Sequence, residues 1–102
     1  TVGAGSITAT SIGSYYRLDN YVDSNVVGDV NVAVSCGASD TLISCNGSFT
    51  NTQNTGFTGT SMANKTCTAK GRVYNNTGQR LNVQGVCFNP DNGARPAGAT
   101  SL

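Results

Sequence analysis

Residues 35–45 read SCGASDTLISC, and this stretch sets two cysteines nine positions apart around turn-forming residues and a short apolar run. In one straight strand, an odd spacing would point the two thiols to opposite faces and leave them too far apart to bond each other. Gly37 to Asp40 have the chemistry of a turn, so the stretch predicts two strand ends joined by a turn. Which residues the two cysteines bond then decides how the strands are arranged.

The residues on both sides of this turn alternate between apolar and polar. Residues 29–36 read DVNVAVSC, which predicts a strand with one buried face. That face holds Val30, Val32, Val34 and Cys36. After the turn, residues 41–45 predict a second strand, on which Ile43 and Cys45 share a face.

Two further strands are predicted later in the chain. Residues 66–74 and 80–88 both alternate between apolar or small residues and polar ones. The inward faces hold Cys67, Ala69, Gly71 and Val73 on the first strand and Leu81, Val83, Gly85 and Cys87 on the second. The residues between them, Asn75-Asn76-Thr77-Gly78, have the chemistry of a hairpin turn, so we expect the two strands to pair side by side.

The rest of the chain has weaker signals. Residues 46–64 are rich in Asn, Thr and Gly and form either a long loop or a strand with a poor signal. Residues 6–12 and 14–22 both have β-forming composition, and residues 1–12 are a candidate arm. Residues 89–102 predict an irregular tail on the surface or against a neighbouring chain. At 102 residues, the chain has the size of one domain.

Composition favours an all-β protein with many turns. Gly, Ser, Thr and Asn supply 48 of the 102 residues, and only 11% of the residues are charged. The net charge is +1 and there is no basic block, which argues against nucleic-acid binding. No apolar run is long enough to cross a membrane, so we expect no membrane insertion.

Four cysteines without a histidine indicate disulfides, because the tight Cys-x2-Cys pairs of a zinc ribbon are absent. Persistent disulfides need an oxidising compartment, so we expect an extracellular or cell-surface protein whose signal peptide has been removed. All four cysteines close apolar strand faces and should point into one core. Of the three connectivities, a Cys36–Cys45 bond would have to close over a tight turn, whereas the nested pairs Cys36–Cys87 and Cys45–Cys67 are more natural.

Three segments carry a resemblance to a known family: VAVSCGASDTLISCNGSF, NKTCTAKGRV and LNVQGVCF. Over about residues 30–88, this pattern resembles the Cys-rich C-terminal modules of the proprotein convertase that controls LDL-receptor levels, modules related to resistin. The resemblance implies the same nested disulfides on a compact antiparallel β-sandwich of jelly-roll type. Those modules carry a third disulfide, whereas here Phe88 follows Cys87 and no cysteine lies upstream of Cys36.

The sequence offers little catalytic chemistry. Histidine and glutamate are absent, and no nucleophile motif surrounds the serines and lysines. Asp19 and Asp23 could lie close together, but two carboxylates in a Tyr-rich segment are more often solvated loop residues. The remaining acids are Asp29, Asp40 and Asp91. We therefore expect a non-catalytic protein with no cofactor.

Three sets of residues are candidates for binding or modification. An aromatic patch for a protein interface or a sugar comprises Tyr15, Tyr16, Arg17 and Tyr21. A weak calcium site, without the spacing or the closing Glu of an EF-hand, comprises Asp23, Asn25 and Asp29; a turn is the simpler interpretation. Candidate glycosylation sequons, which an Asn- and Thr-rich chain also produces by chance, begin at Asn46, Asn64 and Asn75.

Few charged residues remain to protect the edges of the predicted sheets, so loops or another chain must cover them. The arm at residues 1–12 and the tail at residues 89–102 are candidates for that cover, in trans as an added strand. We therefore expect a structural or adhesive module that assembles with itself or with partner proteins, as a subunit of a surface appendage, filament or coat. The alternative is an accessory domain of a larger secreted protein, such as a protease, that recognises a protein or a glycan.

Overall fold

The computed structural model describes residues 13–75, 78–91 and 93–102, and within these residues the protein consists of strands without a helix. The strands are β1 (Ser14–Ser24), β2 (Gly28–Ser35), β3 (Thr41–Phe49), β4 (Thr55–Ala63), β5 (Thr66–Val73), β6 (Gln79–Asn89) and β7 (Thr100–Ser101). The predicted all-β class is confirmed. The candidate strand at residues 6–12 and the arm at residues 1–12 lie outside the described residues.

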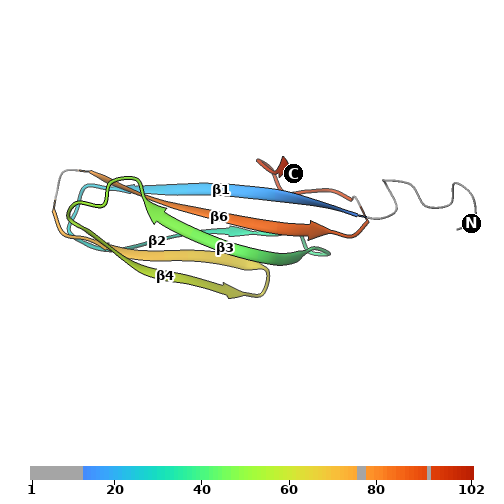
Figure 1. Ribbon diagram of the computed structural model, residues 1–102, viewed down its shortest axis with the longest axis horizontal. Helices are drawn as coiled ribbons and strands as arrows, with labels where there is room; N and C mark the ends of the chain where they lie inside the picture. The colour runs from blue at the N-terminus through green and yellow to red at the C-terminus, as the bar shows by residue number, and fades with distance from the viewer. Residues whose placement is uncertain (1–12, 76–77, 92) are drawn as a thin grey trace, which may run out of the picture.

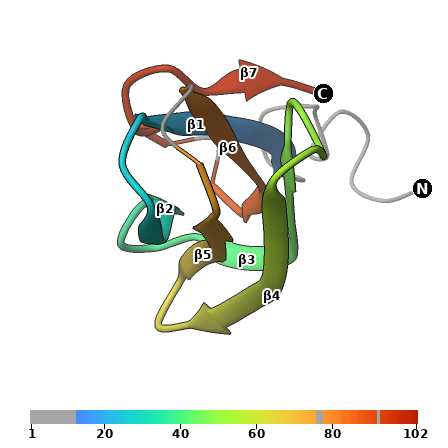
Figure 2. The ribbon, with the colours of Figure 1, turned by 90° about the vertical axis from the view of Figure 1, so that its left-hand side faces the viewer.

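Two antiparallel sheets pack face to face as a sandwich (Figure 1, Figure 2). One sheet has the strand order β3-β6-β1-β7, and the other has the order β2-β5-β4. Only β4 and β5, among the strands described, are neighbours both in sequence and in a sheet. Asn64 and Lys65 form the turn between them, with φ angles of 50° and 68°. Of the two alternatives for residues 46–64, a long loop or a strand, the structure has a strand, β4.

The expected hairpin between residues 66–74 and 80–88 is wrong. β5 pairs with β2 and β4, whereas β6 pairs with β1 and β3, so the connection between β5 and β6 carries the chain from one sheet to the other. The inward faces of both strands were predicted correctly. Alternation reports which side of a strand is buried, but not whether two such strands lie side by side or face each other across the core.

The expectation that Ile43 and Cys45 share a face is also wrong. A β-bulge between Leu42 and Ser44 adds one residue to β3 relative to β6. Leu42 and Cys45 therefore both pack against the core, whereas the side chain of Ile43 is 49% exposed. The predicted turn before β3 is present, but it connects β2 and β3 across the two sheets.

Two disulfides join the sheets, and their pairing confirms the nested connectivity. Cys36–Cys87 links the residue after β2 to β6 across 51 positions of sequence. Cys45–Cys67 links β3 to β5 across 22 positions. Each bond therefore fixes a strand of one sheet over a strand of the other.

The core between the sheets has two parts. Tyr16 and Leu18 pack around the Cys36–Cys87 disulfide in one part. The buried residues of the other part are Val32, Phe49, Cys67, Ala69, Val73, Leu81 and Val83. Gly71 makes room for the ring of Phe49, because a Cβ on Gly71 would lie 2.5 Å from the ring atom Cε2. A glycine on the inward face of β5 thus lets β3 approach closely.

The tail after β6 folds back onto its own chain. Its strand β7 pairs antiparallel with Tyr16 and Arg17 on the outer edge of β1, and the Leu102 N–H donates a 3.2 Å hydrogen bond to the Tyr15 carbonyl. The Arg95 guanidinium donates to the hydroxyl of Ser14 and ties the tail to the start of β1. The tail that was expected to be irregular therefore ends in a short strand in cis.

We expect Gly71→Ala to lower the free energy of unfolding by about 1–3 kcal/mol, because the new methyl group would overlap the ring of Phe49. Gly93→Ala is a matched control, since a Cβ at Gly93 meets no atom within 4 Å, and its effect should stay within about 0.5 kcal/mol. Urea denaturation of the two variants checks this. Equal stability of both variants and the parent would show that β3 and β5 do not approach this closely.

Replacing both Cys45 and Cys67 by alanine should lower the free energy of unfolding by about 3 kcal/mol, and the corresponding Cys36/Cys87 variant should lose about 4 kcal/mol, because each bond restricts the unfolded chain over its loop. Parallel urea denaturation of the two double variants measures the losses. Losses below about 1 kcal/mol for both would contradict a stabilising role for the disulfides.

A candidate assembly interface

β3 lies directly over β5, and three successive contacts show this register. Cys45 bonds Cys67. Two residues further along both strands, a Cβ on Gly47 would lie 2.7 Å from the Cβ of Ala69. Two residues further again, Phe49 packs on Gly71, as described above. Each inward residue of β3 therefore meets β5. β3 also touches β4, because Cys45 Sγ lies 3.6 Å from the Ser61 carbonyl oxygen and a Cβ on Gly47 would lie 3.1 Å from the ring atom Cε1 of Phe57.

The opposite sheet nevertheless covers β4 only in part. On β5, the inward residues Cys67 and Ala69 are 0% exposed, and their neighbours on β4 are Met62 and Thr60. Met62 is 51% exposed and Thr60 is also exposed, as is Phe57 at 45%. The same face of the same sheet thus changes from fully buried to half exposed within one strand spacing.

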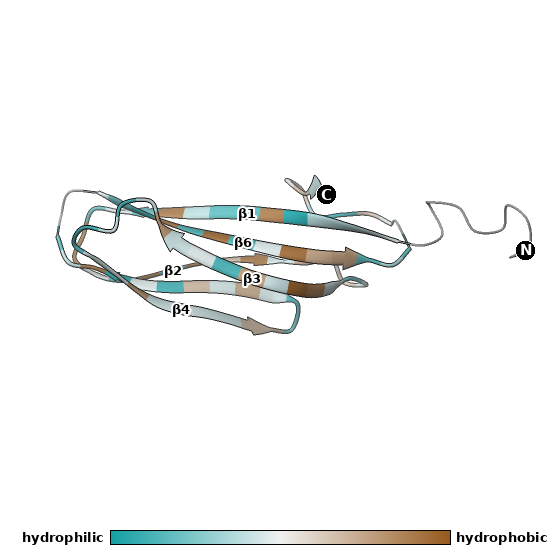
Figure 3. Ribbon diagram, viewed as in Figure 1, coloured by the Kyte–Doolittle hydropathy of each residue, from teal (hydrophilic) through white to brown (hydrophobic). Residues whose placement is uncertain are grey.

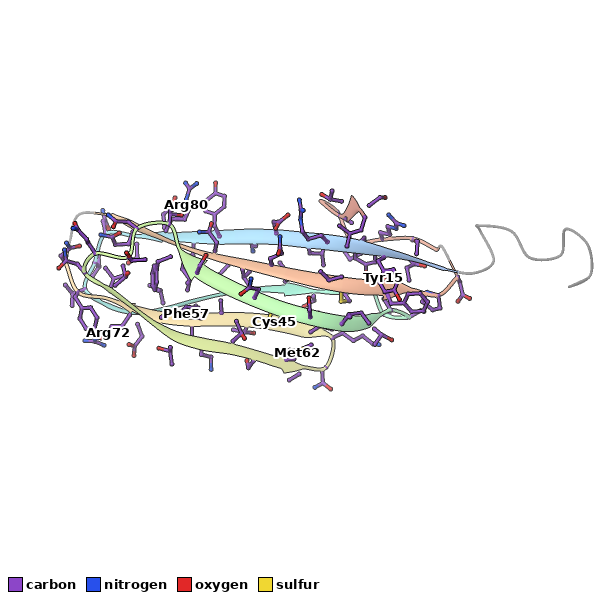
Figure 4. All side chains as sticks on the ribbon, in the orientation of Figure 1. Tyr15, Cys45, Phe57, Met62, Arg72 and Arg80 are labelled. Atoms are coloured by element: carbon purple, nitrogen blue, oxygen red, sulfur yellow. A yellow bond between two sulfur atoms is a disulfide. The ribbon has the colours of Figure 1, made fainter. Side chains whose placement is uncertain are left out.

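The space between the free edge of β3 and the inward face of β4 is called here the β3/β4 groove. The inward residues of β4 that form its floor are Thr55, Phe57, Thr60 and Met62. Two hollows of about 300 and 250 Å³ mark its two ends, one beside Phe57 and the other beside Met62. Figure 4 shows Phe57, Cys45 and Met62 following one another along this side of the sandwich.

The β3/β4 groove has no charge on either of its strands. The six basic and five acidic residues of the chain all lie outside Thr41–Phe49 and Thr55–Ala63. In Figure 3, β4 is pale along its length and lacks the teal bands that mark β1 and β6. Proteins commonly keep exposed edge strands apart with charged side chains, lysine above all. Neither strand of this flank has that protection, although Lys65, in the turn after β4, lines the hollow beside Met62.

The opposite flank, between β1 and β2, is bridged. The side-chain amide of Asn20 on β1 donates a 3.2 Å hydrogen bond to the carbonyl of Ala33 on β2. The tail residues Pro96 and Ala97 lie beside the same two strands, and β7 covers the start of the β1 edge. A hollow of about 350 Å³ remains between these strands and the tail. The two flanks therefore differ in what lines them: residues of the tail lie beside the β1/β2 flank, whereas the half-exposed side chains of Phe57 and Met62 lie in the β3/β4 groove.

Two of the predicted aromatic residues lie on the outer face of β1. Tyr15 is 49% exposed and Tyr21 is 53% exposed, with Arg17 between them on the same face. The ring centroid of Tyr15 lies 5.0 Å from that of Phe88, and the guanidinium of Arg80 lies 3.9 Å from the ring centroid of Tyr21. Both rings thus rest on a neighbouring strand and still present a surface to solvent.

Tyr16 does not belong to this patch, so its place among the predicted surface residues is wrong. It points into the core and is 0% exposed, because successive residues of a strand alternate between faces. Its hydroxyl donates to the Asp40 carboxylate and accepts a 3.0 Å hydrogen bond from the Gly37 N–H. The Lys65 ammonium donates to the Asp40 carbonyl, so this network holds the turn between β2 and β3 against β1.

Two of the three calcium candidates, Asp23 and Asp29, are paired with arginines. Asp23 accepts hydrogen bonds of 2.7 and 3.1 Å from Arg80, and Asp29 accepts one of 2.9 Å from Arg72. The hydrogen bonds from Arg80 hold the pKa of the Asp23 carboxyl below its usual range. Among the residues described, no group of three or more acidic or cysteine side chains could hold a metal ion.

The three candidate sequons have different settings. Asn46 is exposed on β3, where its side chain accepts a hydrogen bond of 2.9 Å from the Gly47 N–H. Asn64 is exposed in the turn between β4 and β5. Asn75 is half-buried and accepts a hydrogen bond from Gln79, and its sequon continues into residues outside the described ones. Asn46 and Asn64 are thus accessible in the folded chain.

The sequence did not predict the pairing of Phe57 and Met62 on one face. Their separation of five positions would place them on opposite faces of a regular strand. A bulge between Phe57 and Gly59 adds one residue to β4 and brings both side chains to the inward face. Gly59 was the signal of this bulge in the sequence, because an isolated glycine in a strand often marks a bulge. Its φ angle in the structure is 144°.

No protein-family model, curated protein or solved structure matches the chain. The resemblance to the convertase modules therefore stays a prediction from the cysteine pattern. The described part of the chain contains no helix long and apolar enough to cross a membrane.

The Tyr16 network predicts how stability depends on alkaline pH. Burial, and the hydrogen bond from the hydroxyl to Asp40, raise the pKa of Tyr16 above its ordinary value. Because the folded protein holds this proton more tightly than the unfolded chain, the stabilisation is complete below the pKa of an unfolded tyrosine, about 10, and is lost as pH rises through the folded pKa. The free energy of unfolding should therefore fall above about pH 10.

Tyr16→Phe should remove this alkaline loss and should lower stability at pH 8 by about 1–3 kcal/mol, since the buried partners of the hydroxyl are left unsatisfied. Tyr21→Phe, at an exposed position of the same strand, is the control and should keep the alkaline loss. Urea denaturation between pH 8 and about 11 measures both effects. Parallel pH profiles for the parent and Tyr16→Phe would contradict this account.

Proposed function

We propose that the protein is a non-catalytic, extracellular structural or adhesive module that assembles with copies of itself, as a subunit of a surface appendage, filament or coat. The observation that carries this proposal is the β3/β4 groove, whose two strands carry no charge and whose floor has Phe57 and Met62 half exposed. Such an edge is a template for pairing with another chain, and exposed apolar side chains beside it favour burial by a partner.

The disulfides and the acidic residues support the rest of the proposal. Two disulfides that join the sheets suit an oxidising environment such as the cell exterior. The carboxylates of Asp19, Asp23, Asp29 and Asp40 all accept hydrogen bonds from neighbouring side chains. Carboxylates engaged in such structural contacts support a protein that acts by binding and not by catalysis.

We expect Met62→Lys to fold like the parent and to lose self-assembly, because it places a charge in the β3/β4 groove at an already exposed position. Ala33→Lys is the matched control: it adds the same charge at an exposed position on β2, the other outer strand of the same sheet. Light scattering and negative-stain electron microscopy of non-denatured protein compare the three chains. Monomeric parent protein at every concentration would contradict self-assembly.

The parent assembly should also be insensitive to salt. Both strands of the β3/β4 groove are uncharged, so their association has no ion pair for salt to screen. The assembled fraction should change little between about 0.05 and 0.5 M NaCl, as measured by sedimentation. Dissociation over this range would point to the charged outer face of β1 as the contact instead.

A second candidate function is recognition of a protein or a glycan, as an accessory domain of a larger secreted protein. The exposed rings of Tyr15 and Tyr21 favour it, since they lie on one face of β1 with polar residues between them. Binding to immobilised glycans or to surface proteins should then weaken in Tyr21→Ala, while the assembly state stays unchanged. Binding that persists in both Tyr15→Ala and Tyr21→Ala would show that the outer face of β1 is not the binding surface.

A further inference from the structure

We infer that the β3/β4 groove accepts residues 1–12 of a second copy of the chain as an added strand beside β3. This inference rests on the proposed self-assembly and names the two surfaces that meet. The added strand would extend the sheet β3-β6-β1-β7 by one position on the side of β4, whose inward side chains Phe57 and Met62 are half exposed.

The acceptor is the outer edge of β3. β3 pairs with β6 along Thr41–Phe49, and no described strand pairs with its other edge. In an antiparallel pair, alternate residues direct their N–H and C=O groups away from the partner, so half of the β3 backbone groups face the groove. A new strand would satisfy them at a spacing of about 4.8 Å from β3.

The floor of the groove explains why the strand would add to β3 and not to β4. Packed sheets lie about 10 Å apart, and β3 itself already covers β5. β3 also touches β4 at Ser61 and Phe57, so the next strand position beyond β3 lies on the β4 side, where its inward side chains would cover the exposed parts of Phe57 and Met62. A strand added to the free edge of β4 would extend away from these side chains and leave them exposed.

The donor segment matches this site in composition and length. Residues 1–12 read TVGAGSITATSI, with no charge and no proline. Every side chain is either β-branched or small, and none is larger than isoleucine. An uncharged segment suits a groove whose strands are uncharged. Twelve residues reach about 40 Å when extended, which exceeds the roughly 30 Å of the nine residues of β3.

A second copy fits the site better than the same chain does. Residues 1–12 join β1 at Gly13, which lies against Phe88 and Asn89 at the end of β6. The new strand position is three strand spacings from β1, about 14 Å, and crossing that distance in cis would use about four residues. The chain would also have to turn back across the ends of β6 and β3, whereas a segment from a second copy can pair along all of β3.

Amide hydrogen exchange of the full-length protein tests the acceptor. We compare the parent assembly with the monomeric Met62→Lys protein. Alternate amides of Thr41–Phe49 should exchange at least about tenfold more slowly in the assembly, because only the outward-facing N–H groups gain a partner. The amides of β2, the other outer strand, are the internal control and should exchange alike in both samples.

A synthetic peptide of residues 1–12 tests the donor. Added in excess to the full-length protein, it should reduce the assembled mass and slow the same alternate amides of β3. A peptide of the same composition in scrambled order is the control, and it should leave the assembled mass unchanged.

The outcomes separate the two proposals. Assemblies in which β3 amides exchange at the monomer rate, or in which the peptide has no effect, overturn this inference and leave self-assembly standing. Slow exchange of β3 amides in a monomeric parent protein means that residues 1–12 pair in cis, which overturns the inference as well. Monomeric parent protein with fast β3 exchange removes the proposed function and the inference together.

Discussion

The Cys45–Cys67 disulfide sets the register of the sandwich, because it fixes β3 over β5. Along the same line, Gly47 and Gly71 have no side chain, and this lets β3 approach until Phe49 packs on β5. In this position β3 also touches β4 at Ser61 and at the ring of Phe57, but it covers β4 only in part. Phe57 and Met62 therefore stay half exposed on the inward face of β4.

The other parts of the structure act to close the opposite flank. The hydroxyl of Tyr16 joins β1 to the turn after β2 through Asp40 and Gly37, and the tail continues the cover as β7. One flank thus has the tail of its own chain beside it, and the other presents the half-exposed side chains of Phe57 and Met62. This asymmetry suits a subunit that receives a strand on one side, and it makes a head-to-tail contact between copies the natural geometry.

Alternation and cysteine spacing were enough to predict the all-β class, the inward faces of β2, β5 and β6, and the nested disulfides, because burial of one face repeats every second residue. They could not place β5 and β6 in different sheets, since each strand shows the same pattern in either arrangement. Bulges caused the other errors: one extra residue turned Ile43 outward on β3, and another brought Phe57 and Met62 together on β4. Tyr16 was grouped with the neighbouring tyrosines as a surface residue, and its buried partner, Asp40, lies 24 residues away in the sequence. The candidate groove could therefore be recognised only from the packing of the two sheets.

The most direct test of this account is a structure of the native assembly by electron cryomicroscopy, at a resolution that separates strands. The account predicts one additional strand beside β3, covering Phe57 and Met62, with connected density leading from it to β1 of a neighbouring subunit. A reconstruction in which the β3/β4 groove faces solvent, and in which subunits meet only through the outer face of β1, would contradict it.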